Sequence, residues 1–199
     1  MESRLLYSIT KETLDNEIDR LCDLFSQGYV EQVLNQSTEL LKKFPDSVAL
    51  NIIKGDANTK LQKFDAAVTS YRNAIKLKPD FAVSHFNLGV ALQDKGDFET
   101  ALHSYKKAIA IKPDYLAAYY NIAVSFGKIG FLENSVKYFL EAIRLNPYHY
   151  SSWNNLLFPL HILKNQNSNS FKNLMKKIEL LTNKKARMNL EILKYDLCR

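Results

Sequence analysis

Four prolines recur along the chain at a constant interval, and this recurrence constrains the fold more than any other sequence feature. Pro45, Pro79, Pro113 and Pro147 are each separated by 34 residues. Proline cannot continue a helix and disfavours helical angles at the residue before it, so each one predicts the end of a helix. A fixed period of this length is typical of solenoids, in which similar supersecondary units stack along the chain.

Other positions keep the same period, and each has a physical role. Apolar residues recur at helical spacing, which predicts two amphipathic helices per repeat. Small residues let two helix backbones approach closely, and one aromatic position fills the space between neighbouring helix pairs. The small positions are Gly55, Gly89 and Ala123, then Ala67, Ala101 and Ser135, then Ala74, Ala108 and Ala142; the aromatic position holds Tyr71, Tyr105 and Phe139.

Residues that punctuate helices occur at fixed places in the repeat. Gly96 and Gly130 predict turns between the two helices of a pair. An aspartate follows three of the prolines, as Asp46, Asp80 and Asp114. We expect these aspartates to cap the next helix.

The pattern resembles the tetratricopeptide repeat family. Residues 82–115 are nearly a consensus copy, with Asn87, Leu88, Gly89, Leu92, Gly96, Phe98, Ala101, Tyr105, Ala108 and Pro113. The resemblance implies an all-α fold, a right-handed α-solenoid of tandem helix-turn-helix repeats with a C-terminal capping helix. It also implies a concave groove lined by the first helix of each pair.

The period divides the chain into an N-terminal segment over 1–13, a repeat array over 14–163 and a basic helical cap over 164–199. Within the array, 14–47 is degenerate, 48–81, 82–115 and 116–149 are regular, and 150–163 begins a fifth repeat. The predicted helix pairs are 11–26 and 29–43, 47–61 and 64–77, 81–95 and 98–111, 115–129 and 132–145, and 150–163 and 171–182. Residues 164–170 are predicted as a polar loop and 185–197 as the capping helix.

Composition bounds the class of protein. The 199 residues are 46% apolar, which is enough for a core and excludes wholesale disorder. No stretch reaches the roughly 18 apolar residues of a membrane span, and the first residues lack an apolar signal-peptide core. We therefore expect a soluble, cytoplasmic protein. Its cysteines, Cys22 and Cys198, are expected to be thiols, with Cys22 in a core.

The net charge of +6 is concentrated at one end of the chain. Residues 164–199 carry nine basic and three acidic residues, whereas residues 1–163 are balanced. A solvated, lysine-rich helix face explains this best. A nucleic-acid partner is not expected, because arginines and aromatics are not interleaved with the lysines. The first 31 residues are acidic, so a homo-oligomer formed by head-to-tail contacts stays open as an alternative.

Catalytic patterns are missing from the sequence. It contains no phosphate-binding loop, no cysteine pair with metal spacing, no zinc-protease histidine pair and no nucleophile elbow. We therefore predict that the chain is not an enzyme and has no cofactor and no metal site.

The predicted groove carries the candidate binding residues. Family positions that face inward include Ile52, Asp56 and Lys60 in one repeat and Asp94 and Lys128 in later ones. Heat-shock co-chaperones of this family hold a partner's terminal carboxylates with Lys, Asn and Arg. The Lys and Arg positions of that clamp hold Ile52, Val83, Phe86, Ala117 and Tyr120 here, which argues against carboxylate binding.

An asparagine recurs every 34 residues on the predicted groove, as Asn87, Asn121 and Asn155. An amide both donates and accepts hydrogen bonds, so it can pair with a peptide backbone without reading its sequence. The pattern is similar to the asparagine ladder in the repeat arm of O-linked N-acetylglucosamine transferase. The alternative is that each asparagine makes a structural hydrogen bond. The predicted contacts are Phe86, Asn87, Val90, Tyr120, Asn121, Val124, Asn154, Asn155 and Phe158.

These features predict a scaffold or adaptor module that binds a protein, as a peptide or a partner helix, in the groove. Two alternatives stay open. The chain could be the repeat region of a larger, bacterial-type enzyme such as a sulfotransferase, glycosyltransferase or hydroxylase, or it could be a self-assembling scaffold. Residues 1–10 could also dock in the groove of their own chain.

Overall fold

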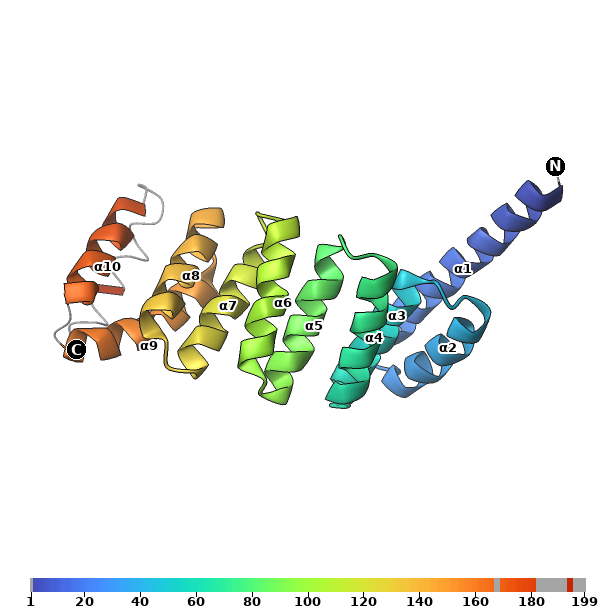
Figure 1. Cartoon of the computed structure of the whole chain (residues 1–199), viewed down its shortest axis with the longest axis horizontal. Coiled ribbons are helices and arrows are strands. Elements are labelled where there is room, and N and C mark those ends of the chain that lie inside the picture. Colours follow the sequence, from blue (N-terminus) through green and yellow to red (C-terminus); the bar gives the residue numbers. More distant parts are fainter. Residues whose placement is uncertain (1, 167–168, 182–192, 195–199) are drawn as a thin grey trace. The chain divides into compact units, whose positions relative to one another are not determined.

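The computed structural model describes residues 2–166, 169–181, 193 and 194, and the regular structure in these ranges is entirely helical (Figure 1). This confirms the predicted all-α class. The helices are α1 (Glu2–Ser26), α2 (Val30–Lys43), α3 (Val48–Lys60), α4 (Phe64–Leu77), α5 (Ala82–Lys95), α6 (Phe98–Ile111), α7 (Leu116–Lys128), α8 (Leu132–Leu145), α9 (Tyr150–Asn165) and α10 (Asn169–Leu181).

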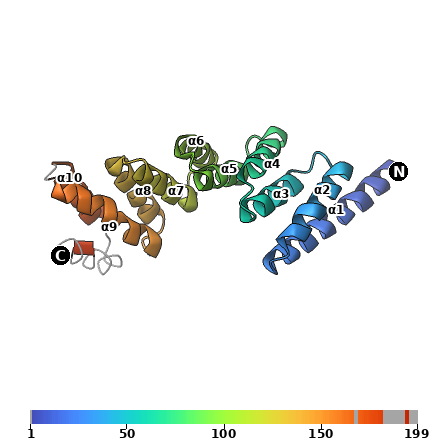
Figure 2. The ribbon, with the colours of Figure 1, turned by 90° about the horizontal axis from the view of Figure 1, so that it is seen from below.

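The helices form two compact units, residues 1–95 (unit 1, α1–α5) and residues 96–199 (unit 2, α6–α10). In unit 1, α3 packs against α2 and α4, and α4 packs against α5. In unit 2, α7 packs against α6 and α8, and α8 packs against α9. Consecutive helices are therefore neighbours within each unit, as Figures 1 and 2 show. This is the tandem helix-pair packing of an α-solenoid.

The conserved spacing of small and aromatic positions is explained by packing between paired helices. Tyr71, Tyr105 and Phe139 are buried, and so are the alanines one helical turn from them. A Cβ atom added at Gly55 would lie 2.7 Å from Cζ of Tyr71, too close for any side chain. The small and aromatic positions are thus the two halves of one contact between α3 and α4.

The turns within the helix pairs use a left-handed residue at a shared position. Gly28, Gly96 and Gly130 have φ of 87°, 92° and 84°, which confirms the predicted turns at Gly96 and Gly130. The fourth residue at this position is Gln62, with φ of 58°. A side chain in the left-handed region is strained, so the turn between α3 and α4 is the costly one of the four.

The predicted aspartate caps are wrong at two of the three positions. The N-cap of α3 is Ser47, whose Oγ accepts from Leu50 N at 3.3 Å, and the N-cap of α7 is Tyr115, which makes no side-chain cap bond. Asp46 and Asp114 each lie one residue too early, because the chain needs a further turn residue before each helix begins. Asp97 does cap α6, by accepting from Thr100 N.

The ends of the array differ from the predicted boundaries. Helix α1 runs without a break from Glu2, so the first helix begins earlier than the predicted residue 11. Helix α9 continues to Asn165, and most of the predicted loop over 164–170 is helical. Cys22 is exposed, not in a core, because the core-facing residue of this turn is its neighbour Leu21.

The C-terminal part of unit 2 closes over α9. Leu174 and Ile178 of α10 are buried in one cluster with Leu160 and Leu163, and Leu193 joins them. The capping helix predicted over 185–197 lies outside the described residues except at Leu193 and Lys194. None of the helices in the described part of the chain combines the length and apolarity that a bilayer crossing requires.

Candidate functional site

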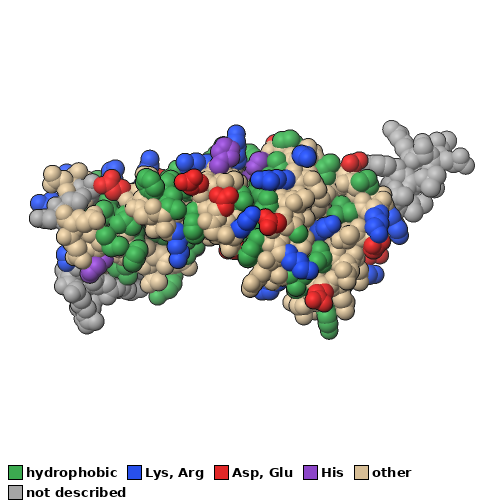
Figure 3. Space-filling view, turned by 60° about the horizontal axis from the view of Figure 1, so that its bottom comes forward, with side chains coloured by type: hydrophobic (Ala, Val, Ile, Leu, Met, Phe, Trp, Pro, Cys, Tyr) green, Lys and Arg blue, Asp and Glu red, His purple; other side chains and the backbone are tan. Residues whose placement is uncertain are grey.

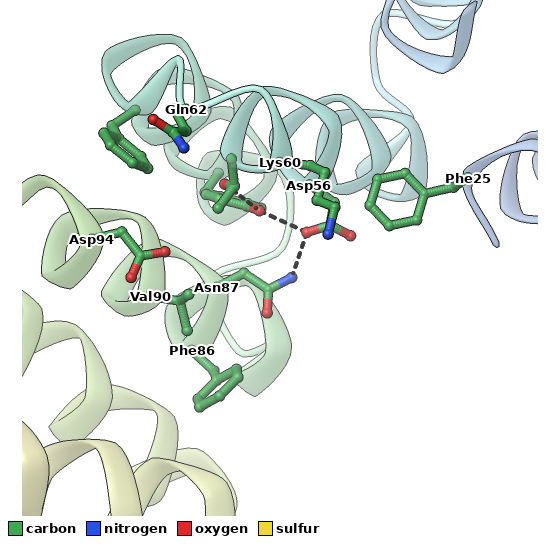
Figure 4. A pocket seen from close by; sticks show the side chains of 11 residues that line it. Phe25, Asp56, Lys60, Gln62, Phe86, Asn87, Val90 and Asp94 are labelled. Atoms are coloured by element: carbon green, nitrogen blue, oxygen red, sulfur yellow. Dashed lines mark hydrogen bonds between the residues drawn. The ribbon is translucent and has the colours of Figure 1, made fainter. Parts of the chain in front are cut away.

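Unit 1 contains an open pocket of about 760 Å³ on the side of the first helices of its repeats. Helices α1, α3, α4 and α5 and the turn after α3 all contribute to it (Figure 4). Aromatic side chains form much of its wall, and its charged groups are two carboxylates and one lysine. The lining residues are Phe25, Asp56, Thr59, Lys60, Gln62, Phe64, Tyr71, Phe86, Asn87, Val90 and Asp94.

The carboxylate of Asp56 is held in a fixed position in this pocket. Its Oδ1 accepts from the Tyr71 hydroxyl at 2.6 Å and from Asn87 Nδ2 at 3.0 Å, the two dashed bonds of Figure 4. The Tyr71 hydroxyl also lies 3.2 Å from Thr59 Oγ1. Three helices, α3, α4 and α5, therefore meet at a single carboxylate oxygen.

Burial disfavours the ionised form of the Asp56 carboxyl group. Desolvation raises its pKa above the ordinary value of 3.8, although the bonds from Tyr71 and Asn87 act in the opposite direction. Among the residues that the structure describes, Asp56 forms no ion pair. Burial and the charge of Asp56 raise the pKa of Tyr71, so its hydroxyl stays protonated and remains a donor.

Unit 2 has a second pocket of about 570 Å³, lined in part by Val124, Asn155, Phe158 and Pro159. Asn155 Nδ2 donates to the Tyr120 hydroxyl at 2.6 Å. The ring of Tyr120 lies between Phe139 and His149, with centroid distances of 5.8 Å and 5.4 Å. Packing and a hydrogen bond thus fix the Tyr120 ring against α9.

Each of the recurring asparagines donates one hydrogen bond from Nδ2, although the acceptors differ. Asn121 Nδ2 donates to the Tyr105 hydroxyl at 3.3 Å, as Asn155 does to Tyr120 and Asn87 to Asp56. Each bond uses one of the two amide N–H donors. Within the described residues the three carbonyl oxygens accept no hydrogen bond, so each amide keeps an acceptor and a donor for a ligand.

The structure brings six of the nine predicted contacts together, three in the pocket of each unit, and the other three line neither pocket. Phe86, Asn87 and Val90 line the pocket of unit 1. In unit 2, Val124, Asn155 and Phe158 line one pocket, Tyr120 and Asn121 lie on α7, and Asn154 is exposed on α9. Phe158 is 64% exposed.

Sequence reasoning missed several residues of the unit 1 pocket. Asp56, Lys60 and Asp94 were inward-facing family positions but were not among the predicted contacts. Phe25, Phe64 and Gln62 were not expected at all. Gln62 carried a usable signal, because it replaces the glycine that the other three turns have at this position.

Comparison with protein-family models identifies the repeats. The family described as "TPR repeat" matches residues 55–96 and 92–130, and the family described as "Tetratricopeptide repeat" matches residues 116–149. No curated protein matches the chain in sequence.

Solved structures with similar folds are also tetratricopeptide repeat proteins. A MamA fragment (41-end) from Desulfovibrio magneticus RS-1 matches with a TM-score of 0.68 and 20% identity, over 87% of this chain and 92% of that one. The first repeat domain of Spaghetti, bound to an HSP90 peptide, matches with a TM-score of 0.57 and 22% identity, over 59% and 93%. Thermobaculum terrenum O-GlcNAc transferase matches with a TM-score of 0.63 and 22% identity, over 66% of this chain and 26% of that one.

The chain therefore belongs to the tetratricopeptide repeat family, as its periodicity predicts. The fold is that of a protein-interaction scaffold, a class whose repeats are typically non-catalytic. Among the described residues, no three His, Cys, Asp or Glu side chains cluster in a way that could hold a metal ion.

Proposed function

We propose that this protein binds an extended segment of a partner protein along the first helices of its repeats, and that it acts as an adaptor rather than an enzyme. The observation that carries the proposal is the make-up of the two pocket linings, each taken within its own unit. Each contains one of the recurring asparagines with apolar neighbours that the repeat pattern also places there. These are Phe86, Asn87 and Val90 in unit 1 and Val124, Asn155 and Phe158 in unit 2.

The asparagines are suited to holding a peptide backbone. The intramolecular bonds fix the direction of each amide, and the remaining donor and acceptor match one peptide N–H and one C=O. Preorganised groups of this kind lose little entropy on binding. The exposed ring of Phe158 and the half-buried rings of Phe86 and Tyr120 add apolar contact without strict sequence selection.

The experiment is a selection of displayed random peptides with the whole chain, followed by backbone methylation of the selected peptide. Methylating one peptide nitrogen at a time removes the N–H donors of the hydrogen bonds that the asparagine carbonyl oxygens would accept. We expect at least two positions at which methylation weakens binding by about tenfold, the loss of one well-formed hydrogen bond to a ligand. The protein is unchanged in this test, so a loss of folding cannot imitate the result.

A matched pair of variants locates the binding surface. The first variant combines Asn87→Ala, Asn121→Ala and Asn155→Ala. The control variant combines Asn73→Ala and Asn134→Ala, which change exposed asparagines on second helices of the repeats. Binding should be lost in the first variant and kept in the second. If no peptide is selected, or if methylation has no effect, the proposal is wrong.

A further inference from the structure

The geometry points to a subsite for a cationic side chain, with arginine preferred, in the pocket of unit 1. There the Asp56 carboxylate would pair with the cation beside the ring of Phe25. The inference deepens the proposed function and rests on it, because Phe86, Asn87 and Val90 line this pocket and also belong to the proposed peptide path. It assigns a charge to one residue of the bound segment.

Asp56 is oriented for an external partner. Its Oδ1 is occupied by the two bonds from Tyr71 and Asn87. Within the described residues its Oδ2 accepts no hydrogen bond, and Figure 4 shows this second oxygen directed away from both dashed bonds, on the side of Phe25. A carboxylate that is partly withdrawn from water and lacks a cation costs free energy, and a cation from a ligand would offset that cost.

The lining of the pocket contains two carboxylates, Asp56 and Asp94, and one lysine, Lys60. Asp94, exposed on the last turn of α5, is a second carboxylate in the lining. Helix α1 carries Asp19 and Asp23. The pKa of Cys22 is raised first by desolvation and then by the charges of Asp19, Asp23 and Asp56. In the pocket itself, burial raises the pKa of Tyr71, and the charges of Asp56 and Asp94 both raise it further. Lys60, the basic residue of the lining, is exposed, and Figure 4 shows its side chain on the Asp56 side of the pocket. It forms no ion pair with a carboxylate of the described residues.

The pocket walls favour an organic cation. Phe25, Phe64, Phe86 and Tyr71 belong to the lining of the pocket, and Figure 4 shows the ring of Phe25 beside Asp56, whereas the ring of Phe86 is directed away from it. Aromatic faces attract cations, and the planar, weakly hydrated guanidinium stacks on them better than an ammonium does. A metal ion is a poor fit, because in the described residues no group of three potential ligands converges here.

The occupant is therefore an arginine side chain of the bound peptide. This charge preference is opposite to that of the carboxylate-binding clamp of the co-chaperones. A carboxylate of a ligand would be repelled by the carboxylate of Asp56. The face of the molecule drawn in Figure 3 is not acidic as a whole, because basic, acidic and apolar side chains are interspersed on it. Selection for arginine should thus be confined to one position of the ligand.

The test uses the random peptides selected above. We expect arginine to be enriched at a single position. Replacing that arginine with citrulline, its neutral isostere, should weaken binding to the wild-type chain about tenfold, and replacing it with lysine should have a smaller effect. Against Asp56→Asn, the citrulline and arginine peptides should bind within about twofold of each other.

Two further variants serve as controls. Asp80→Asn neutralises an exposed aspartate outside the lining and should leave the arginine preference intact. Lys60→Gln removes the competing cation and should strengthen that preference.

The outcomes separate the two proposals. If peptides are selected without arginine enrichment, or if Asp56→Asn keeps the preference, the cation subsite is wrong and peptide binding stands. If no peptide is selected, both are wrong. The citrulline comparison on the wild-type chain needs no variant, so it decides the inference even if Asp56→Asn does not fold.

Discussion

Gly55 and Tyr71 share one space: the tyrosine ring fills the position that a side chain at Gly55 would need, with Cζ 2.7 Å from an added Cβ. This contact brings the Tyr71 hydroxyl to within 2.6 Å of Asp56 Oδ1. The absence of one methyl group on α3 therefore allows both the packing of α4 and the placement of the pocket's carboxylate.

Gly55→Ala should destabilise the protein although alanine is the better helix former. Overpacking of a filled core costs about 1–3 kcal/mol, which exceeds the gain of about 1 kcal/mol in helix propensity. The urea midpoint of the helical circular dichroism should fall. A rise in the midpoint would show that the Tyr71 ring moves aside at no cost. Gly55→Ala combined with Tyr71→Leu, which vacates the space, should recover part of the loss.

Asp56→Asn should be as stable as the wild type at pH 7, or more stable. The pKa of Asp56 is raised in the folded state above 3.8, so the folded chain holds this proton more tightly than the unfolded chain does. Wild-type stability therefore falls as the pH rises through the window from about 3.8 to the raised pKa. The asparagine variant lacks this dependence. Urea midpoints at pH 3, 5 and 7, with Asp80→Asn as the control, test it; a clear destabilisation at pH 7 would contradict it.

Asn155→Ala should cost more stability than Asn154→Ala, its exposed neighbour on α9. Asn155 donates to Tyr120 over 2.6 Å, and losing such a bond costs about 0.5–1.5 kcal/mol. Asn154 is exposed, and its replacement should change stability by less than about 0.5 kcal/mol. Thermal midpoints of the two variants provide the comparison. Equal midpoints would mean that the Asn155 bond contributes nothing to folding.

Gln62→Gly should stabilise the turn between α3 and α4 by up to about 1 kcal/mol, because glycine removes the strain of a left-handed residue. The reciprocal change Gly96→Gln should destabilise by a similar amount, since a Cβ at Gly96 meets open space and adds strain alone. Urea denaturation measures both. Two changes of the same sign would exclude backbone strain as the cause.

Cys22 should react slowly with iodoacetamide at pH 8. Although the residue is exposed, partial desolvation of its thiol and the charges of Asp19, Asp23 and Asp56 raise the pKa of that thiol. In a Cys198→Ser background, Asp23→Asn should speed the reaction and Asp80→Asn should not. The pH dependence of the alkylation rate gives the pKa of the thiol directly. An unchanged rate in Asp23→Asn would show that the charge of Asp23 does not act on the thiol of Cys22.

The periodic part of the fold could be predicted from the sequence because repetition averages out local ambiguity. Pro79 and Pro113 mark helix ends that agree with the observed ends, Leu77 and Ile111, to within two residues. The ends of the array were less predictable. Nothing in the period indicates that α1 begins at Glu2 or that α9 passes Leu163, because these boundaries depend on contacts without an equivalent in the next repeat.

The pocket of unit 1 was only partly predictable. The repeat placed Asp56 on an inward position but gave no sign of its bonds, since these depend on Tyr71 and Asn87 from the two following helices. Phe25 belongs to the degenerate first repeat, where the pattern is weakest. The period predicts which direction a residue faces, but it does not predict which side chains from neighbouring helices bond to each other.

The boundary between the two compact units, after Lys95, lies inside a sequence repeat rather than between repeats. Helix α5 packs with α4, and its repeat partner α6 packs with α7. A gene fusion or graft that keeps the pocket of unit 1 should therefore not be made at a repeat boundary. A crossover at Pro79 would separate Asn87 from Asp56 and transfer only part of the pocket lining. A crossover at the Gly96 turn, in the middle of a repeat, would transfer the carboxylate with both of its donors intact.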